Sequence, residues 1–136
     1  MILTPAMQSV ALYAGLNGLI LLWLAIHVST VRGRERISIG DGGNPAMIRA
    51  MRGMANFIEF VPLILLQMAL MAAIGAPVWL IHAFGIALTF GRLAHGWHFS
   101  RDDAAGWQRM AGAGITFLLL AAASVGLVGH GLFGVF

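Results

Sequence analysis

The chain has 136 residues, of which 60% are hydrophobic and only 10% are charged, and its formal net charge at pH 7 is +3. Soluble domains carry about 25% charged residues, so this composition predicts an integral membrane protein with one domain, residues 1–136. All eight basic residues are arginines and there is no cysteine, which excludes disulfides, thiolate metal sites and a thiol nucleophile within the protein. Because several arginines lie in or beside apolar runs, no nucleic-acid partner is expected.

Four apolar segments have lengths near the ~20 residues that cross a bilayer as a helix. They run from about residue 10 to 31, 45 to 74, 78 to 99 and 107 to 134. A tight turn at Gly75–Pro77 separates the second segment from the third. The sequence therefore predicts an all-α fold, an integral membrane four-helix bundle in a lipid bilayer.

The arginines outside these segments predict the orientation of the chain. The first loop, residues 32–45, contains three arginines, and the third connection, residues 101–107, contains another. The N-terminus, the turn at residues 75–77 and the C-terminus contain none. An even number of spans puts both arginine-bearing loops on one side, which the positive-inside rule makes cytoplasmic. We therefore expect both termini to lie outside.

A polar stripe marks the second span. Arg52, Asn56 and Glu59 follow one another at i, i+4 and i+7, and Arg49 lies one turn earlier. At 3.6 residues per turn these side chains share a narrow face of a helix. Charges at membrane depth are costly unless they face protein or water, so by default they mark a functional site. The alternative is a buried network that only locks helices together.

The third span contributes Arg92 and His95, which share a face with Phe99. A guanidinium binds a carboxylate in a bidentate manner, so Arg92 is expected to reach Glu59 from a neighbouring helix. His95 is interpreted either as a hydrogen-bonding partner of a ligand or as a core histidine. The pair His95 and His98 lacks further ligands at metal-binding spacing, so no metal site is expected.

Charge counting favours an anionic ligand at the cytoplasmic half of the bundle. Arg49, Arg52, Arg92 and Arg109 lie in the membrane or at its edge, against the single acid Glu59. The surplus of guanidinium groups suits a ligand with carboxylates. The alternative is that Arg49 and Arg109 extend to lipid phosphates.

Two motifs carry a resemblance to a known family. The second span reads Arg49-x-x-Arg52-x-x-x-Asn56-x-x-Glu59-x-x-Pro62, and the third reads Gly91-Arg92-Leu93-x-His95. These motifs, the chain length and the four spans resemble the MAPEG superfamily of membrane-associated eicosanoid and glutathione proteins, over nearly the whole chain. The chain is most similar to the small bacterial members of the cell inner membrane. The resemblance implies a homotrimer of four-helix subunits, with glutathione bound between subunits near the cytosolic face.

The resemblance also implies roles for individual residues. Arg52, Asn56 and Glu59 match glutathione-binding positions, and His95 matches a position that lines the same site. With Arg49 and Arg92 they make up the expected cofactor-binding set. Arg109 resembles the catalytic arginine that stabilises the thiolate.

The expected activity is that of a glutathione-dependent transferase or peroxidase, acting on lipophilic electrophiles or hydroperoxides that enter from the bilayer. Since the protein has no cysteine, the thiol must arrive with glutathione as co-substrate, and a nearby guanidinium lowers the pKa of a thiol. Phe60 and Phe99 stand where many family members have tyrosine, which motivates a first alternative, a homologue that binds glutathione or lipid without catalysis. A small membrane transporter is a second alternative, although the first span lacks the acid that four-span exporters use.

Overall fold

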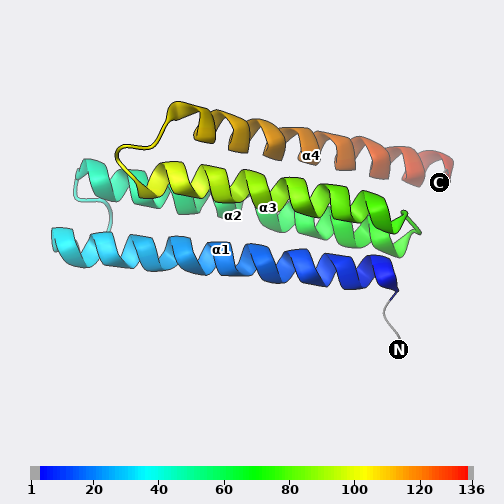
Figure 1. Ribbon diagram of the computed structural model, residues 1–136, viewed down its shortest axis with the longest axis horizontal. Coiled ribbons are helices and arrows are strands. Elements are labelled where there is room, and N and C mark those ends of the chain that lie inside the picture. The colour runs from blue at the N-terminus through cyan, green and yellow to red at the C-terminus, as the bar shows by residue number, and fades with distance from the viewer. Residues whose placement is uncertain (1–3, 135–136) are drawn as a thin grey trace.

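The computed structural model describes residues 4–134 and contains four long helices in this part of the chain (Figure 1). They are α1 (Pro5–Glu35), α2 (Pro45–Ala73), α3 (Val78–Ser100) and α4 (Gly106–Phe133), and consecutive helices run antiparallel. Each is long and apolar enough to cross a membrane. The prediction of an all-α membrane protein with four helices is therefore confirmed.

Capping residues explain where the first two helices begin. The side chain of Thr4 accepts a hydrogen bond from the backbone of the first turn of α1, and Pro5 follows it. Asn44 and Pro45 begin α2 in the same way. A polar cap followed by proline is a strong helix start signal. Because of this start signal, α1 begins at Pro5, five residues before the start of the apolar segment at about residue 10.

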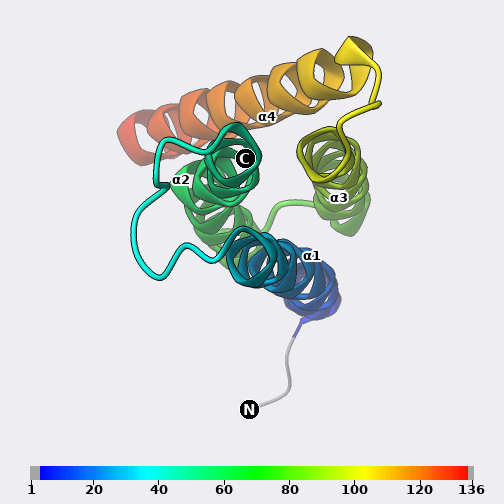
Figure 2. The same cartoon turned by 90° about the vertical axis from the view of Figure 1, so that its left-hand side faces the viewer.

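The two middle helices form the centre of the bundle. α2 and α3 contact each other. α1 packs against both of them, and α4 packs against both from the side away from α1 (Figure 2). Within the described residues α1 and α4 make no contact. Side chains of α2 and α3 consequently face neighbours on two sides. They include the most completely buried apolar residues of the core, Ile64, Met68, Ile81 and Leu88.

Hydrogen bonds between side chains join the helices away from the arginine-bearing loops. Such bonds substitute for water in a membrane interior and bring helices into one register. Two of them link α1 to α3: Tyr13 with His82 at 2.8 Å and Asn17 with Thr89 at 3.1 Å. A third links α2 to α4, between Gln67 and Ser124 at 2.8 Å.

Charged side chains gather towards one end of the bundle. All eight arginines and all five acids fall within residues 32–59 and 92–109. These stretches lie in the half that contains the α1–α2 and α3–α4 connections (Figure 1). We call this half the loop end. The assignment of the loop end to the cytoplasm stays a prediction.

Candidate functional site

Arg92 is the centre of a polar cluster where α2, α3 and α4 meet. Its side chain is only 1% exposed. Nη1 and Nη2 both donate to Oδ1 of Asn56, at 3.0 and 3.1 Å, and Nη1 also donates to Oγ1 of Thr116 at 3.2 Å. The hydroxyl of Thr116 donates in turn to the carbonyl of Gly112 at 2.7 Å. One guanidinium thus joins three helices.

The predicted pairing of Arg92 with Glu59 is wrong. Ion pairs in the described part of the chain join Arg34 to Glu35 and Arg101 to Asp103, and none involves Arg92. The reason is the rotation of α2 about its axis. Glu59 is displaced by about 60° around the helix from Asn56, since three residues fall short of one 3.6-residue turn. Asn56 therefore turns towards α3, whereas Glu59 is exposed.

Arg92 is a buried cation without a carboxylate partner among the described residues. Its guanidinium carbon lies 5.3 Å from the ring centroid of Phe57, and its Nε is buried without a hydrogen-bond partner. Nη2 lies 3.4 Å from Nδ1 of His95, a residue that is 3% exposed. Arginine can only donate, so Nδ1 accepts and the ring proton of neutral His95 is on Nε2. Among the described residues, no carboxylate pairs with the positive charge of the cluster.

Arg49 belongs to the same stripe but serves the end of α3. Its Nη2 donates to the backbone carbonyls of His98 and, at 3.0 Å, of Arg101, and its guanidinium lies 5.6 Å from the ring centroid of Phe99. The last carbonyls of a helix have no partner within the helix and need donors from elsewhere. Arg49 therefore caps α3 from α2 and lies apart from the Arg92 cluster.

Arg52, Glu59 and Arg109 are exposed on the surface of the single chain. Glu59 lies in an open cleft of about 350 Å³ between α1 and α2, which Arg32 also lines. Arg109 is the fourth residue of α4. The structure thus brings Asn56, Arg92 and His95 together but leaves these three charged residues outside the cluster.

Thr116 is the member of the cluster that the sequence analysis missed. Its signal is weak: it follows Gly112 by four residues on α4, a spacing of small residues that is typical of close helix packing. A Cβ atom at Gly112 would lie 2.6 Å from Cβ of His95, so only glycine lets α4 approach α3 this closely. That approach carries Thr116 to Arg92.

The two phenylalanines at expected tyrosine positions are packing residues in this structure. A Cβ atom at Gly53 would lie 2.6 Å from Cβ of Phe99, so Phe99 fills the space over that glycine. Phe60 meets Phe117 of α4 edge to face, with ring centroids 5.3 Å apart. Neither position supplies a hydroxyl group to a ligand.

The comparisons with known proteins agree with the motifs. The sequence model of the MAPEG family matches residues 10–129. Inner membrane protein YecN of Escherichia coli (strain K12) is 37% identical over 89 residues, which cover 65% of this chain and 68% of that protein. Inner membrane protein YecN of Escherichia coli O6:H1 gives the same values. No solved structure matches the chain.

Proposed function

The chain belongs to the MAPEG family and is a multi-pass inner-membrane protein, and from this premise we propose that it is a glutathione-dependent transferase or peroxidase. Its substrates are lipophilic electrophiles or hydroperoxides that arrive through the bilayer. The observation that carries the proposal is the division of the α2 stripe. Asn56 accepts hydrogen bonds from the buried guanidinium of Arg92, whereas Arg52 and Glu59 are exposed on a helix long and apolar enough to span a membrane.

The exposed charges support a site that a second copy of the chain completes. Arg52 and Glu59 lie about 10 and 21 Å along α2 from Pro45, at 1.5 Å per residue. Charged groups this far into a span face protein or water instead of lipid. A neighbouring subunit in the proposed homotrimer would cover them and enclose the ligand. The number of three subunits comes from the family resemblance.

Glutathione fits the charges of this face and of the Arg92 cluster. It carries two carboxylates, one ammonium group and a thiol. Arg52, Arg92 and Arg109 supply guanidinium groups for the anionic groups, and the single acid Glu59 complements the ammonium. Because Arg92 lacks an anionic partner in the described chain, a ligand carboxylate near it would lower the cost of burying its charge. Arg49 contributes positive charge at a distance while it caps α3.

The chemistry begins with loss of the thiol proton. Arg109 is proposed to stabilise the thiolate, which attacks an electrophilic carbon and forms a C–S bond as a leaving group departs or an epoxide opens. With a hydroperoxide, the thiolate attacks the terminal peroxide oxygen, so that an S–O bond forms as the O–O bond breaks. The alkoxide takes up a proton, equivalent to the one lost from the thiol, and leaves as the alcohol, while glutathione becomes a sulfenic acid. The thiol of a second glutathione then attacks the sulfur of this acid, which gives glutathione disulfide and water.

The test is a titration of purified, detergent-solubilised protein with glutathione, followed by the ultraviolet absorbance of the thiolate. Saturable binding with a thiolate signal at neutral pH is the expected result. Turnover of a model electrophile and of a lipid hydroperoxide then separates transferase from peroxidase activity. Absence of binding at millimolar glutathione would overturn the proposal.

Phe60 and Phe99 favour a second candidate function, glutathione or lipid binding without catalysis. Both rings pack against protein neighbours where a tyrosine would offer a hydroxyl group. Saturable binding without a thiolate signal or turnover would support this candidate over the enzyme.

A further inference from the structure

In the half of the bundle opposite the loop end, His82 of α3 lies between two side chains of α1. This half contains the turn between α2 and α3, and we call it the turn end (Figure 1). The Nε2 atom of His82 lies 3.1 Å from the hydroxyl oxygen of Ser9, and its Nδ1 atom lies 2.8 Å from the hydroxyl oxygen of Tyr13. Both ring nitrogens of one histidine thus hold α3 against α1. We call Ser9, Tyr13 and His82 the histidine junction.

The neighbours of the histidine junction determine which atom donates each proton. The hydroxyl of Ser9 donates to the backbone carbonyl of Pro5 at 3.0 Å, and a carbonyl oxygen can only accept. Because Ser9 has a single hydroxyl proton, Nε2 of His82 must donate to the oxygen of Ser9. In the neutral ring Nδ1 then has no proton and accepts from the hydroxyl of Tyr13. Neutral His82 therefore satisfies every member of the junction.

A second proton on His82 would break this arrangement. Both nitrogens of a protonated imidazole donate, so Nδ1 would present a proton to Tyr13, and the hydroxyl proton of Tyr13 would have to turn away. Among the described residues this hydroxyl has no hydrogen-bond partner other than His82. Tyr13 is only 5% exposed, so water cannot replace the lost acceptor while the helices stay in contact. Because a buried polar group without a partner costs free energy, protonation opposes the closed contact.

The turn end also lacks a negative charge to balance protonated His82. All five acids of the chain lie within residues 35–59 and 102–103. On α2 the closest of them to the turn is Glu59, fourteen residues before the end of the helix and about 21 Å from it at 1.5 Å per residue. On α3 the nearest charged residue is Arg92, about 15 Å away along the axis. His130 of α4, the other histidine of this end in the described chain, can add only positive charge.

Tyr13 fits closely against α3 in this contact. A Cβ atom at Gly85 would lie 2.0 Å from Cδ2 of Tyr13, so the phenol ring lies directly on this glycine. One turn further along both helices, Asn17 donates to Thr89 at 3.1 Å. This second contact contains no titratable group, so acid does not alter it. It keeps α1 and α3 together in the middle of the bundle and confines any separation to the turn end.

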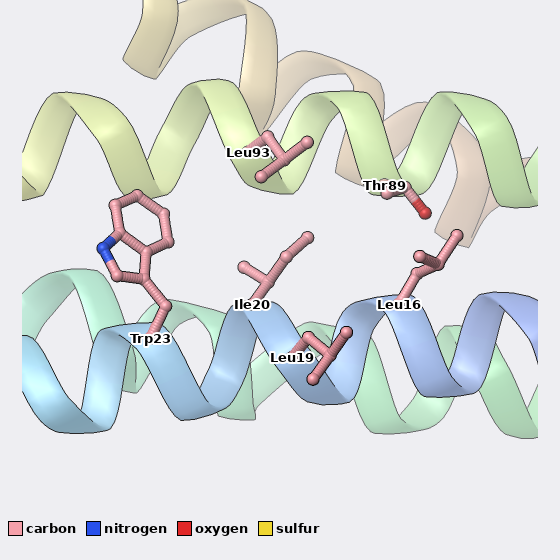
Figure 3. Close-up of a pocket in the computed structure, with 6 residues that line it drawn as sticks. All are labelled: Leu16, Leu19, Ile20, Trp23, Thr89 and Leu93. Atoms are coloured by element: carbon pink, nitrogen blue, oxygen red, sulfur yellow. The ribbon is translucent and has the colours of Figure 1, made fainter.

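An apolar groove of about 300 Å³ lies next to this second contact, between α1 and α3. Figure 3 shows Leu16 of α1 and Thr89 of α3 at one end of the groove and Trp23 at the other. Leu16 follows Tyr13 by three residues, so that end of the groove is the one nearer the histidine junction. Separation of the helices at the junction would therefore lengthen the groove towards the turn end.

We propose that His82 is a pH-sensitive latch between α1 and α3. The neutral ring holds the turn-end halves of the two helices together through Ser9 and Tyr13. Protonation lifts Tyr13 from Gly85, separates these halves and extends the apolar groove. Histidine is the side chain whose charge ordinarily changes between about pH 5 and 8, and His82 is half-buried, so protons can reach it. The latch is independent of the Arg92 cluster and of glutathione.

The test measures the distance between spin labels on α1 and α3 by double electron–electron resonance. Because the chain has no cysteine, labels attach only to introduced cysteines. Leu12→Cys with Ile86→Cys, both at exposed positions, reports on the turn end, and Ile26→Cys with Trp97→Cys reports on the loop end. Labelled protein is mixed with an excess of unlabelled protein in phosphatidylcholine nanodiscs, so that only distances within one chain are measured.

We expect the turn-end distance to lengthen by several ångströms between about pH 8 and about pH 5, the range in which histidine gains its proton. The loop-end distance should stay constant, which also shows that the fold is kept. A histidine variant and a matched control identify the titrating group. His82→Gln has an amide donor and an amide acceptor but cannot gain a proton, so its turn-end distance should no longer depend on pH. His130→Gln changes a histidine on α4, a helix without contact to α1 in the described residues, and should respond to acid like the parent protein.

A turn-end distance that does not change in acid would overturn the proposal. A response that persists in His82→Gln would overturn it as well, because another group would then be titrating. Loss of the response in His130→Gln would transfer the titration to α4. Equal lengthening at both ends would show that acid loosens the whole bundle and that no latch exists at His82.

Discussion

Arg92 and Asn56 form the central polar contact of this protein: both terminal nitrogens of the guanidinium donate to one amide oxygen, at 3.0 and 3.1 Å. The amide satisfies the geometry of the guanidinium but not its charge. Within the described residues no carboxylate pairs with Arg92. A buried cation held by a neutral partner is arranged to attract an anion, and this property links the packing of the bundle to the proposed binding of glutathione.

Exchange of Asn56 should separate the two roles of this contact. Asn56→Ala removes two hydrogen bonds from a buried cation, and we expect a loss of about 2–4 kcal/mol in the free energy of unfolding. Asn56→Asp supplies a carboxylate, so it should keep the fold but weaken glutathione binding by cancelling the charge of Arg92. Unfolding in detergent and glutathione titration measure these effects. Thr116→Val is the control, because it removes the other side-chain oxygen that accepts a hydrogen bond from Arg92 without adding a charge. Unaltered glutathione affinity in Asn56→Asp would argue against a ligand anion near Arg92.

Two glycines of α4 provide a matched test of the α3–α4 contact. A Cβ atom at Gly112 would lie 2.5 Å from the carbonyl oxygen of Gly91, whereas one at Gly114 would meet nothing within 4 Å. Gly112→Ala should therefore destabilise the protein by about 1–3 kcal/mol through overpacking. Gly114→Ala should be neutral or slightly stabilising because alanine favours the helix. The unfolding midpoint in detergent reports both. Similar midpoints for the two variants would contradict the close approach of the helices.

Arg109 is proposed to act on the thiol and has no part in the Arg92 cluster. Arg109→Ala should leave the fold intact, since the side chain is exposed. The pKa of bound glutathione thiol should rise by about one to two units, each worth about 1.4 kcal/mol. Titration of the thiolate absorbance against pH measures this shift. Arg101→Ala is the control, because Arg101 pairs with Asp103 and lies over Trp97. A shift in the control but not in Arg109→Ala would transfer the role to Arg101.

Glu59 should matter for ligand binding more than for the fold of one subunit. It makes no ion pair within the described chain, so Glu59→Gln removes no ionic contact there. The loss of its charge should weaken glutathione binding about tenfold, the effect of one charge-assisted hydrogen bond. The measurement is the dissociation constant, with helix content by circular dichroism as a check on folding. Unchanged affinity would remove Glu59 from the proposed site.

Acidification should loosen the connection between α3 and α4. Hydrogen bonding by Arg101 lowers the pKa of Asp103 below its ordinary value. A carboxyl group with a lowered pKa in the folded state stabilises that state above its unfolded pKa, near 3.9, and loses the contribution as pH falls through the lower folded value. The carboxyl resonance of Asp103 should therefore titrate below the ordinary range of an aspartate, and Arg101→Gln should restore the ordinary value. Titration of Asp103 at its ordinary pKa in the parent protein would show that the ion pair does not persist in solution.

The sequence by itself predicted the number of helices, their approximate ends and the polar stripe of α2. Hydropathy over about 20 residues identifies a span whatever its neighbours are, and capping by Thr4 and Asn44 is local chemistry. The motif Asn56-x-x-Glu59 with Arg92 was likewise sufficient to place a candidate site on α2 and α3. Family membership, now established, was also readable from these residues.

Only the tertiary structure decided which member of the stripe meets Arg92. In almost uniformly apolar helices, periodicity does not show which side faces a neighbour, so the rotation of α2 could not be inferred. The close contact of Phe99 with Gly53 of α2 sets this rotation instead, and the close contact of His95 with Gly112 sets how near α4 lies to α3. These contacts turn Asn56 inward, leave Glu59 outside and bring Thr116 of α4 to the guanidinium. Each of these contacts depends on how side chains of two different helices fit together, and the spacing of residues along one helix does not reveal this fit.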